Sequence, residues 1–138
     1  MIVRIGTVTN VYPKEGKVRV LYEDRDETSV KLPVLAFEYH MPPVGVTVVT
    51  LHMENRSSGF VLGEYWNEDK KPEETGEGLF RKELGEASYV RCDKGKLKIY
   101  SPELALQGEA GAVTLEQLVA LLDRTTDLEN RVSRLEAM

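Results

Sequence analysis

The residues best able to do chemistry in this chain are two histidines and one cysteine, which lie far apart in the sequence. His40 and His52 could be metal ligands or a base, but neither has a cysteine, an aspartate or a second histidine at ligand spacing. Because a metal site needs several converging donors, we interpret both as surface or strand-face side chains. Cys92 would need a positioned base to act as a nucleophile, and its alternation with Val90 favours a small buried apolar side chain.

The acidic run 24–27 offers carboxylates that a calcium ion could use. It lacks the D-x-D-x-D-G spacing and the distal glutamate of a calcium-binding loop, so we expect a solvated loop. No glycine-rich phosphate loop, G-x-S-x-G elbow or H-E-x-x-H motif is present. Paired carboxylates of the glycosidase type could still meet in space. We expect no catalytic residue, no cofactor and no metal, and therefore a protein that is not an enzyme.

Composition limits the partners and the compartment. The 138 residues include 23 acidic and 18 basic side chains, a net charge of −5, which argues against a general phosphate-binding surface. No apolar run is long enough to span a membrane, and the N-terminus lacks the pattern of a signal peptide. Cys92 is the only cysteine, which excludes an intrachain disulfide and suits a reducing compartment. We expect the chain to be made in the cytoplasm.

The elements that would position a functional surface are most clearly marked at the C-terminal end, residues 113–138. Apolar residues recur there at heptad positions a and d, the pattern of a coiled-coil seam, with one threonine as the exception. The a positions are Leu118, Thr125 and Val132, and the d positions are Leu121, Leu128 and Leu135. Thr114-Leu115-Glu116-Gln117 predicts a capping box at the start of this helix, and Val113 and Leu118 occupy the positions of a hydrophobic staple.

Charges flank this seam in the order expected of a parallel assembly. Arg124 at g can pair with Glu129 at e of a neighbouring chain, and Arg131 can pair with Glu136 in the same way. The run 131–136 also resembles a signature of parallel three-stranded coils, so we predict a homotrimer. Three heptads are marginal alone, so a segment upstream must help to hold the chains together. The alternative is an amphipathic helix folded back onto its own domain.

Residues 1–66 consist of short strand patterns separated by turns, including a turn at 55–59. The predicted strands are 2–11, 17–22, 29–35, 46–53 and 60–66, with Val18, Val20 and Tyr22 on one face of the second. Five strands without a confident helix predict a small closed barrel of the OB type, because closure removes exposed edges. Residues 67–78 contain no aliphatic or aromatic side chain and predict a linker.

Residues 79–112 carry four more strand-like pieces, at 79–84, 87–92, 96–100 and 103–107. So short a segment buries too little apolar surface to be stable alone. Three copies wrapped around one axis would close its apolar face, which predicts an intertwined trimeric β-prism or β-helix stalk. The residues expected at that interface are Leu97, Ile99, Leu104 and Leu106. The alternative is a monomeric β-meander packed against the barrel.

Three sequence blocks within residues 1–66 give the chain a resemblance to a known family. The blocks are Ile5-Gly6-Thr7-Val8 with 11–20, Lys31-Leu32-Pro33-Val34-Leu35 with Pro42-Pro43-Val44-Gly45, and Gly59-Phe60-Val61-Leu62-Gly63. Together they resemble the N-terminal OB domain of the phage baseplate assembly protein V family, the central tail spikes of contractile phages and related injection machines. The family layout of OB domain, linker and trimeric β-spike matches the arrangement predicted above from patterning.

This resemblance implies a homotrimeric baseplate spike or hub protein that closes the tube axis and docks on the tail hub and other baseplate proteins. It implies assembly into a virion tail baseplate or a tail-like particle, and leaves open a contact with the host cell envelope. In several family members, H-x-H histidines at a pointed apex hold iron. Here the only histidines are His40 and His52, so no apical metal is expected.

Two other functions stay open. OB domains often bind single-stranded nucleic acid through aromatic side chains beside a basic groove. The predicted barrel has aromatic residues, but its charges are mixed and its net balance is acidic, so we expect no nucleic-acid partner. A trimeric scaffold or adhesin stalk unrelated to phage tails would keep the trimer and lose the baseplate partners.

Overall fold

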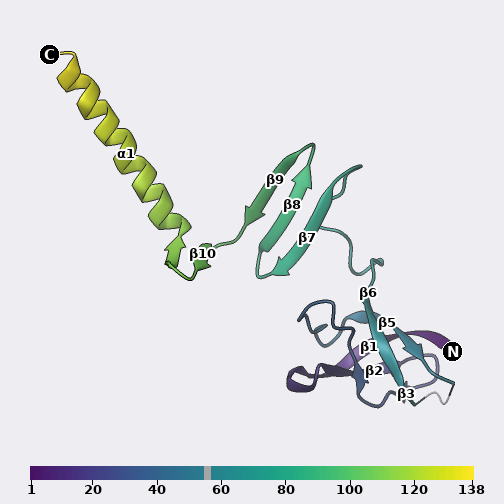
Figure 1. The fold of residues 1–138 in the computed structure, drawn as a ribbon. Helices are drawn as coiled ribbons and strands as arrows, with labels where there is room; N and C mark the ends of the chain where they lie inside the picture. Colours follow the sequence, from purple (N-terminus) through teal and green to yellow (C-terminus); the bar gives the residue numbers. More distant parts are fainter. Residues whose placement is uncertain (55–56) are drawn as a thin grey trace. The chain divides into compact units, whose positions relative to one another are not determined.

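A computed structural model of the chain describes residues 1–54 and 57–138. It is mainly β, with a single α-helix among the described residues, at the C-terminal end (Figure 1). The chain divides into two compact units, Met1–Glu73 and Glu74–Met138, called here the N-terminal unit and the C-terminal unit. The division falls inside segment 67–78, which was predicted to be a linker.

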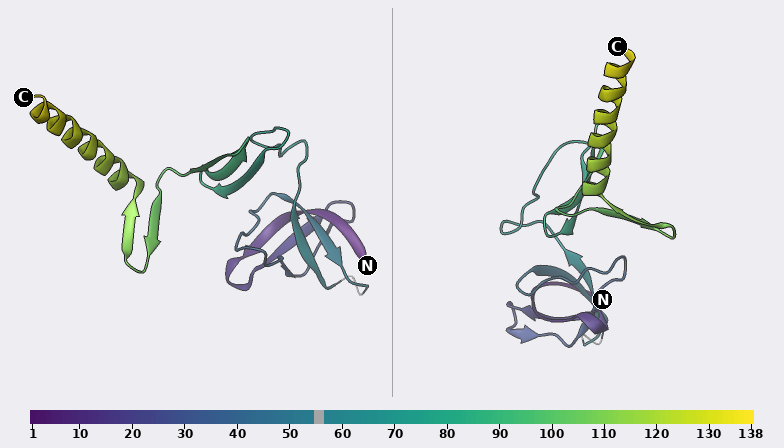
Figure 2. Two further views of the ribbon diagram at one scale, coloured as in Figure 1. Left: turned by 45° about the horizontal axis from the view of Figure 1, so that its top comes forward. Right: turned by 90° about the vertical axis from the view of Figure 1, so that its left-hand side faces the viewer.

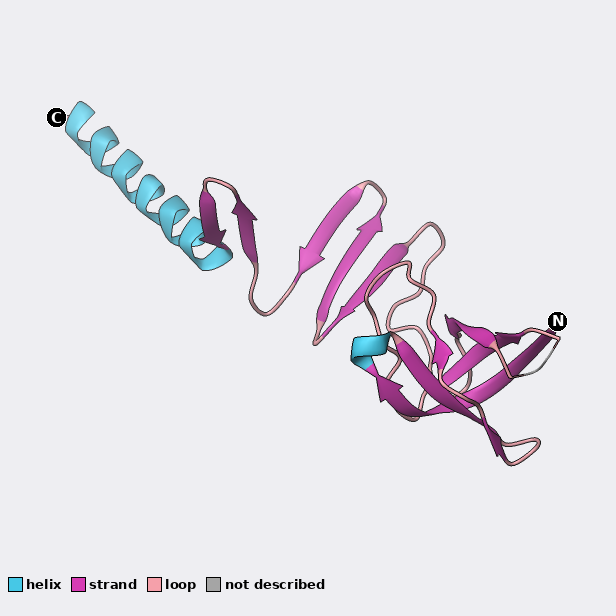
Figure 3. Ribbon diagram, turned by 60° about the horizontal axis from the view of Figure 1, so that its bottom comes forward, coloured by secondary structure: helices cyan, strands magenta, loops and turns pink. Residues whose placement is uncertain are grey.

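The N-terminal unit is built on one antiparallel sheet, whose strands are drawn in magenta in Figure 3. The strand order is β3-β2-β1-β5-β6, and β4 also pairs with β2. The strands are β1 (Ile2–Tyr12), β2 (Lys17–Tyr22), β3 (Glu27–Thr28), β4 (Leu32–Pro33), β5 (Thr47–His52) and β6 (Gly59–Glu64). A 3-10 turn, η1 (Pro13–Glu15), connects β1 to β2 and ends at Gly16, whose φ of 64° is in the region that favours glycine.

The predicted five-stranded closed barrel is wrong in two respects. The strand expected at 29–35 is interrupted. At Ser29 only half of the ladder continues: its N–H donates to the Val20 backbone oxygen at 2.8 Å, but the Val20 N–H donates to the Ser29 hydroxyl, at 3.0 Å, instead of to a backbone oxygen. Among the described residues the sheet does not close. β4 approaches β6 only through an isolated parallel bridge between Val34 and Val61, since a strand of two residues is too short to carry a closing ladder. The turn predicted at 55–59 includes residues 55 and 56, which lie outside the described residues.

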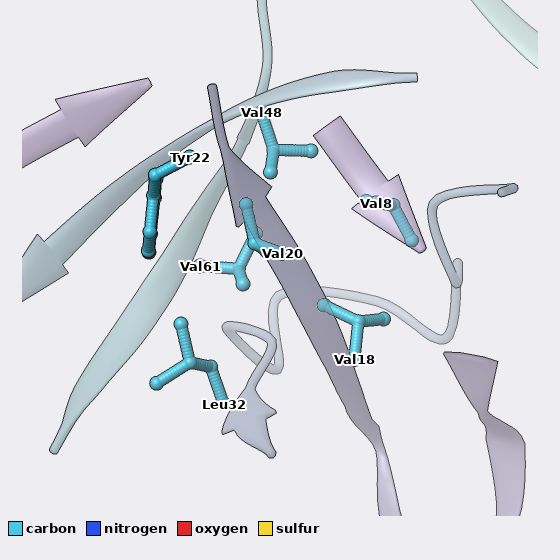
Figure 4. Packing of buried hydrophobic residues seen from close by; sticks show 7 residues of the cluster. All are labelled: Val8, Val18, Val20, Tyr22, Leu32, Val48 and Val61. Atoms are coloured by element: carbon cyan, nitrogen blue, oxygen red, sulfur yellow. The ribbon is translucent and has the colours of Figure 1, made fainter. Parts of the chain in front are cut away.

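The core of this unit lies on the inner face of the sheet and consists of aliphatic side chains and one tyrosine (Figure 4). Its fully buried members are Val8, Val18, Val20, Tyr22, Leu32, Val48 and Val61. The predicted alternation in β2 is confirmed, because Val18, Val20 and Tyr22 are buried while Arg19 between them is exposed. Period-two alternation is what places these side chains on a single face.

The C-terminal unit begins with a three-stranded antiparallel meander of β7 (Phe80–Gly85), β8 (Ser88–Asp93) and β9 (Lys96–Tyr100). Tight two-residue turns join them. Glu86 and Ala87 both have positive φ in the first turn, whereas the second turn uses Lys94 and Gly95. The positions predicted for these three strands from the sequence agree with the structure to within about one residue.

A separate hairpin follows, formed by β10 (Ala105–Gly108) and β11 (Gly111–Thr114), and the helix α1 (Leu115–Glu136) continues directly from it (Figure 2). The fourth predicted strand corresponds to β10, whereas β11 was not predicted. The predicted capping box is confirmed: Gln117 N–H donates to Thr114 Oγ1 at 3.2 Å, and Thr114 N–H donates to Gln117 Oε1 at 2.9 Å. Val113 and Leu118, at the predicted staple positions, are both half-buried.

Candidate interaction surfaces

The residues suited to chemistry are dispersed. His40 is exposed in the loop before β5, whereas His52 is buried at the end of β5. Cys92 is half-buried in β8, so it is less enclosed than the small buried side chain expected from its pattern. Among residues 1–54 and 57–138, no group of three His, Cys, Asp or Glu side chains is placed to hold a metal ion.

His52 belongs to a buried polar cluster that sequence reasoning did not identify. The Tyr22 Oη atom lies 2.5 Å from His52 Nε2 and 2.8 Å from Thr50 Oγ1. The Arg4 guanidinium stacks on the Tyr22 ring at 3.7 Å from its centroid and pairs with the Asp24 carboxylate at 3.4 Å. Burial raises the pKa of the Tyr22 hydroxyl. The cluster therefore fills one part of the inner face with mutually hydrogen-bonded groups, and the acidic loop serves as a counter-charge for Arg4.

The C-terminal unit has no core of its own. None of residues 74–138, all of which the structure describes, is buried. The hydrophobic residues of this unit are therefore available on its surfaces, and they gather on two of them: one side of α1 and one face of the β7–β9 sheet. Contiguous exposed apolar surface of this kind marks sites of interaction in soluble proteins.

The first surface is the predicted seam on α1. Leu118 is half-buried near the hairpin, while Leu121, Leu128, Val132 and Leu135 are exposed, by 50% to 69%. The charged residues expected beside the seam, Arg124, Glu129, Arg131 and Glu136, are exposed as well. α1 contains no buried residue, so the whole of the seam beyond Leu118 is open to solvent in this unit.

Thr125, the polar member of the seam, is internally satisfied. Its hydroxyl donates to the backbone oxygen of Leu121, one turn earlier, at 2.9 Å. A threonine bonded in this way leaves no unmet donor if the position becomes covered. The seam is therefore compatible with burial along its whole length.

The second surface is the apolar face of the β7–β9 sheet. Strand register places Phe80, Cys92 and Leu97 in one row across the three strands, and Val90 pairs with Ile99 in the next row. Phe80, Leu97 and Ile99 are each more than half exposed. In the segment that follows, Leu104 is half-buried and Leu106 is exposed.

The opposite face of this sheet is polar, and its side chains are joined by hydrogen bonds and by stacking. The Glu74 carboxylate accepts hydrogen bonds from Arg91 Nε at 2.9 Å, Arg91 Nη2 at 3.0 Å and Arg81 Nη1 at 3.2 Å. Arg81 stacks on Tyr89, and Tyr89 stacks on Tyr100 with their ring centroids 5.3 Å apart. The pKa of the Glu74 carboxyl is lowered, chiefly by the hydrogen bonds from Arg91. The side chains of the polar face thus find their partners within the chain, whereas those of the apolar face remain exposed.

A third surface lies on the outer face of the N-terminal sheet, and sequence analysis missed it. Apolar side chains from β1, β5 and β6 form adjacent rows on that face. They are Val3, Leu51 and Phe60 in one row, with Ile5, Val49 and Leu62 beside them. Val3 is 63% exposed and Ile5 55%. The signal was present in strand 2–11, where aliphatic residues occupy both alternating sets of positions.

No helix among the described residues is long and apolar enough to cross a membrane. No family model of known proteins matches the chain, and the curated proteins contain no sequence that matches it either.

Proposed function

We propose that this chain is a structural protein of a baseplate: the homotrimeric spike or hub of a contractile phage tail or tail-like injection particle. It would close the tube axis and dock on the tail hub. The observation that carries the proposal is the C-terminal unit, whose described residues bury none of their apolar side chains although they form regular strands and a capped helix.

Self-association through α1 is the simplest way to cover the seam. Burying a leucine side chain contributes about 1.5–3 kcal/mol, so the exposed seam residues of three chains supply the main driving force. The pairs of Arg124 with Glu129 and of Arg131 with Glu136 would be solvent-exposed and worth at most about 1 kcal/mol each. Their role is to favour a parallel arrangement in one register. The helix dipole is complemented by Glu116 in the first turn and Arg134 in the last.

The β7–β9 sheet would form the stalk, with its apolar face turned toward the threefold axis and its polar face toward solvent. Phe80, Leu97 and Ile99 would then meet their counterparts from the other two chains. So short a sheet, which buries none of its side chains, has too little core to be stable alone, and this would make the stalk dependent on the trimer. This role is mechanical and needs no catalytic residue, metal or cofactor.

The N-terminal unit is suited to docking because its outer face is apolar while its own core is complete. In the proposed particle, the face around Val3, Ile5 and Phe60 would contact the tail hub or another baseplate protein. An apolar core surrounded by polar residues is the usual composition of such an interface. This face is accessible because its side chains lie on the side of the sheet away from the core.

The trimer is tested by light scattering on the purified full-length chain. We expect a mass three times the 15.6 kDa of one chain. Leu128→Asp should give the monomer mass, because it places a charge from each chain at one layer of the seam. Ser133→Asp, an outward position of the same helix, is the matched control and should remain trimeric. A monomeric parent, or a Leu128→Asp variant as trimeric as the parent, would refute assembly through the seam.

The baseplate assignment needs a separate test. Contractile tail particles purified from producing cells are labelled with gold-conjugated antibodies against this chain and imaged by electron microscopy. We expect label at the end of the tube. A chain that is trimeric in solution but absent from such particles would instead be a trimeric scaffold or adhesin stalk.

A further inference from the structure

The segment between the two units, residues 67–78, is held to the N-terminal unit at its start by hydrogen bonds and an ion pair. Asn67 Oδ1 accepts hydrogen bonds from the backbone N–H groups of Asp69 at 2.9 Å and Lys70 at 2.8 Å. Asn67 N–H donates to the Lys70 backbone oxygen at 3.0 Å, and the Lys70 ammonium forms an ion pair with Glu64 of β6. Asparagine side chains that bond to the backbone in this way stabilise a turn. Residues 67–70 are therefore ordered as part of the N-terminal unit.

The same segment is fastened at its C-terminal end by Glu74. Its carboxylate bonds to both nitrogens that Arg91 presents along one edge, and also to Arg81, so three charge-assisted hydrogen bonds hold one side chain. The two arginine side chains are only 19% and 21% exposed. Bidentate pairing of an arginine with a carboxylate fixes geometry as well as distance. Glu74 is thereby fixed to the polar face of the β7–β9 sheet.

We propose that the hinge between the two units is confined to residues 71–73, and that the contact of Glu74 with Arg81 and Arg91 sets this length. The sequence pattern had assigned the whole of 67–78 to a linker. Pro72 restricts the backbone angles that the hinge can adopt, because its ring fixes its own φ and disfavours helical angles at Lys71.

The hinge length determines how far the units can move apart. Four residue-to-residue steps from Lys70 to Glu74 span at most roughly 14 Å, whereas a free segment 67–78 would span roughly 45 Å. The short hinge therefore keeps the Cα atoms of Lys70 and Glu74 within this distance at every angle that the hinge adopts. Release of Glu74 would extend the flexible segment as far as Leu79. This inference does not depend on the proposed function, because a monomer would hinge at the same place.

Backbone order parameters from ¹⁵N relaxation of the full-length chain test the proposal. We expect values below about 0.6 only at residues 71 and 73, and values near 0.85 at 67–70 and at 74. In Glu74→Gln, the amides of residues 74–78 should fall below about 0.6 while those of 67–70 are unchanged. The matched control is Glu77→Gln, since Glu77 is exposed and forms no ion pair with any described residue.

Two results would overturn the proposal. One is uniform flexibility across 67–78 in the parent chain. The other is a Glu74→Gln variant whose residues 74–78 remain as ordered as in the parent. Arg91→Lys provides a second variant that keeps the positive charge but not the bidentate geometry. It should loosen residue 74 without unfolding the sheet, which is checked by the unchanged chemical shifts of β8 and β9.

Discussion

The two units of this chain contain similar kinds of secondary structure, but only one of them covers its own hydrophobic residues. The N-terminal sheet curls so that β2, β4 and β6 enclose Val20, Leu32 and Val61, and it even buries a hydrogen-bonded polar cluster around Tyr22. The C-terminal meander, hairpin and helix each have an apolar side and bury nothing. A segment can therefore form regular secondary structure without completing a core. The C-terminal unit has regular strands and a helix, but no core of its own.

The difference follows from chain length and connectivity. In the N-terminal unit, loops of several residues let distant strands return across the same face, as shown by the pairing of β1 with both β2 and β5. In the C-terminal unit, two-residue turns keep β7, β8 and β9 in sequential order, which produces a three-stranded sheet whose own strands leave its apolar face exposed. Such a segment can only complete its core with residues from outside the segment.

The largest expected effect comes from destroying the one core that the chain has. Val20→Asp places a charge at a position with no exposure, and we expect it to unfold the N-terminal unit at a cost above about 4 kcal/mol. Two-dimensional NMR should lose the dispersed signals of β1–β6, while light scattering still reports the mass of the parent assembly. Arg19→Asp, on the exposed side of the same strand, is the control. Loss of the assembly as well would show that the two units depend on each other for stability.

A moderate effect is expected from the buried polar cluster. Tyr22→Phe keeps the ring under Arg4 but removes the hydroxyl that contacts His52 Nε2 and Thr50 Oγ1. Leaving such groups buried without a partner costs about 1–3 kcal/mol. Urea denaturation of the N-terminal unit measures this loss, with Tyr12→Phe as the matched variant. Equal stability of the two variants would mean that the cluster adds nothing to the core.

The smallest expected effect concerns α1, which must be helical for its apolar residues to line up as a seam. Thr114→Ala removes the capping hydroxyl of the confirmed capping box and should destabilise α1 by about 1 kcal/mol. We expect a lower melting temperature for the assembly, followed by circular dichroism at 222 nm. Thr126→Ala, an exposed mid-helix position, should leave the melting temperature unchanged or raise it slightly. If both variants melt alike, the cap does not limit assembly.

Local patterns predicted most of the individual elements. Alternation located β2, β7, β8 and β9, and the Thr114 and Gln117 pair located the start of α1, because these signals depend on residues adjacent in sequence or one helical turn apart. The hairpin strand β11 was missed because Gly111 and Ala112 carry no strand preference. Val113 is the one aliphatic β-branched residue in this strand, which is too few for an alternating pattern.

Long-range features could not be predicted in the same way. The interruption of the strand expected at 29–35 involves the Ser29 hydroxyl replacing a backbone acceptor, a competition that no periodicity reveals. The contact of Glu74 with Arg81 and Arg91 depends on the fold of the β7–β9 sheet, so composition alone made Glu74 part of a featureless linker. The α1 seam was visible as a heptad pattern, but the partner that would cover it is outside any one chain and stays a prediction.

The two turns of the β7–β9 meander also bear on the order in which it forms. The β8–β9 turn places Gly95 at its second position, where positive φ costs a glycine nothing. The β7–β8 turn requires positive φ at both Glu86 and Ala87, a conformation that side chains with a Cβ resist. In the β8–β9 turn only Lys94 pays this cost, so the β7–β8 turn stores more backbone strain. We therefore expect β8 and β9 to pair first during folding, and β7 to join the hairpin that they form.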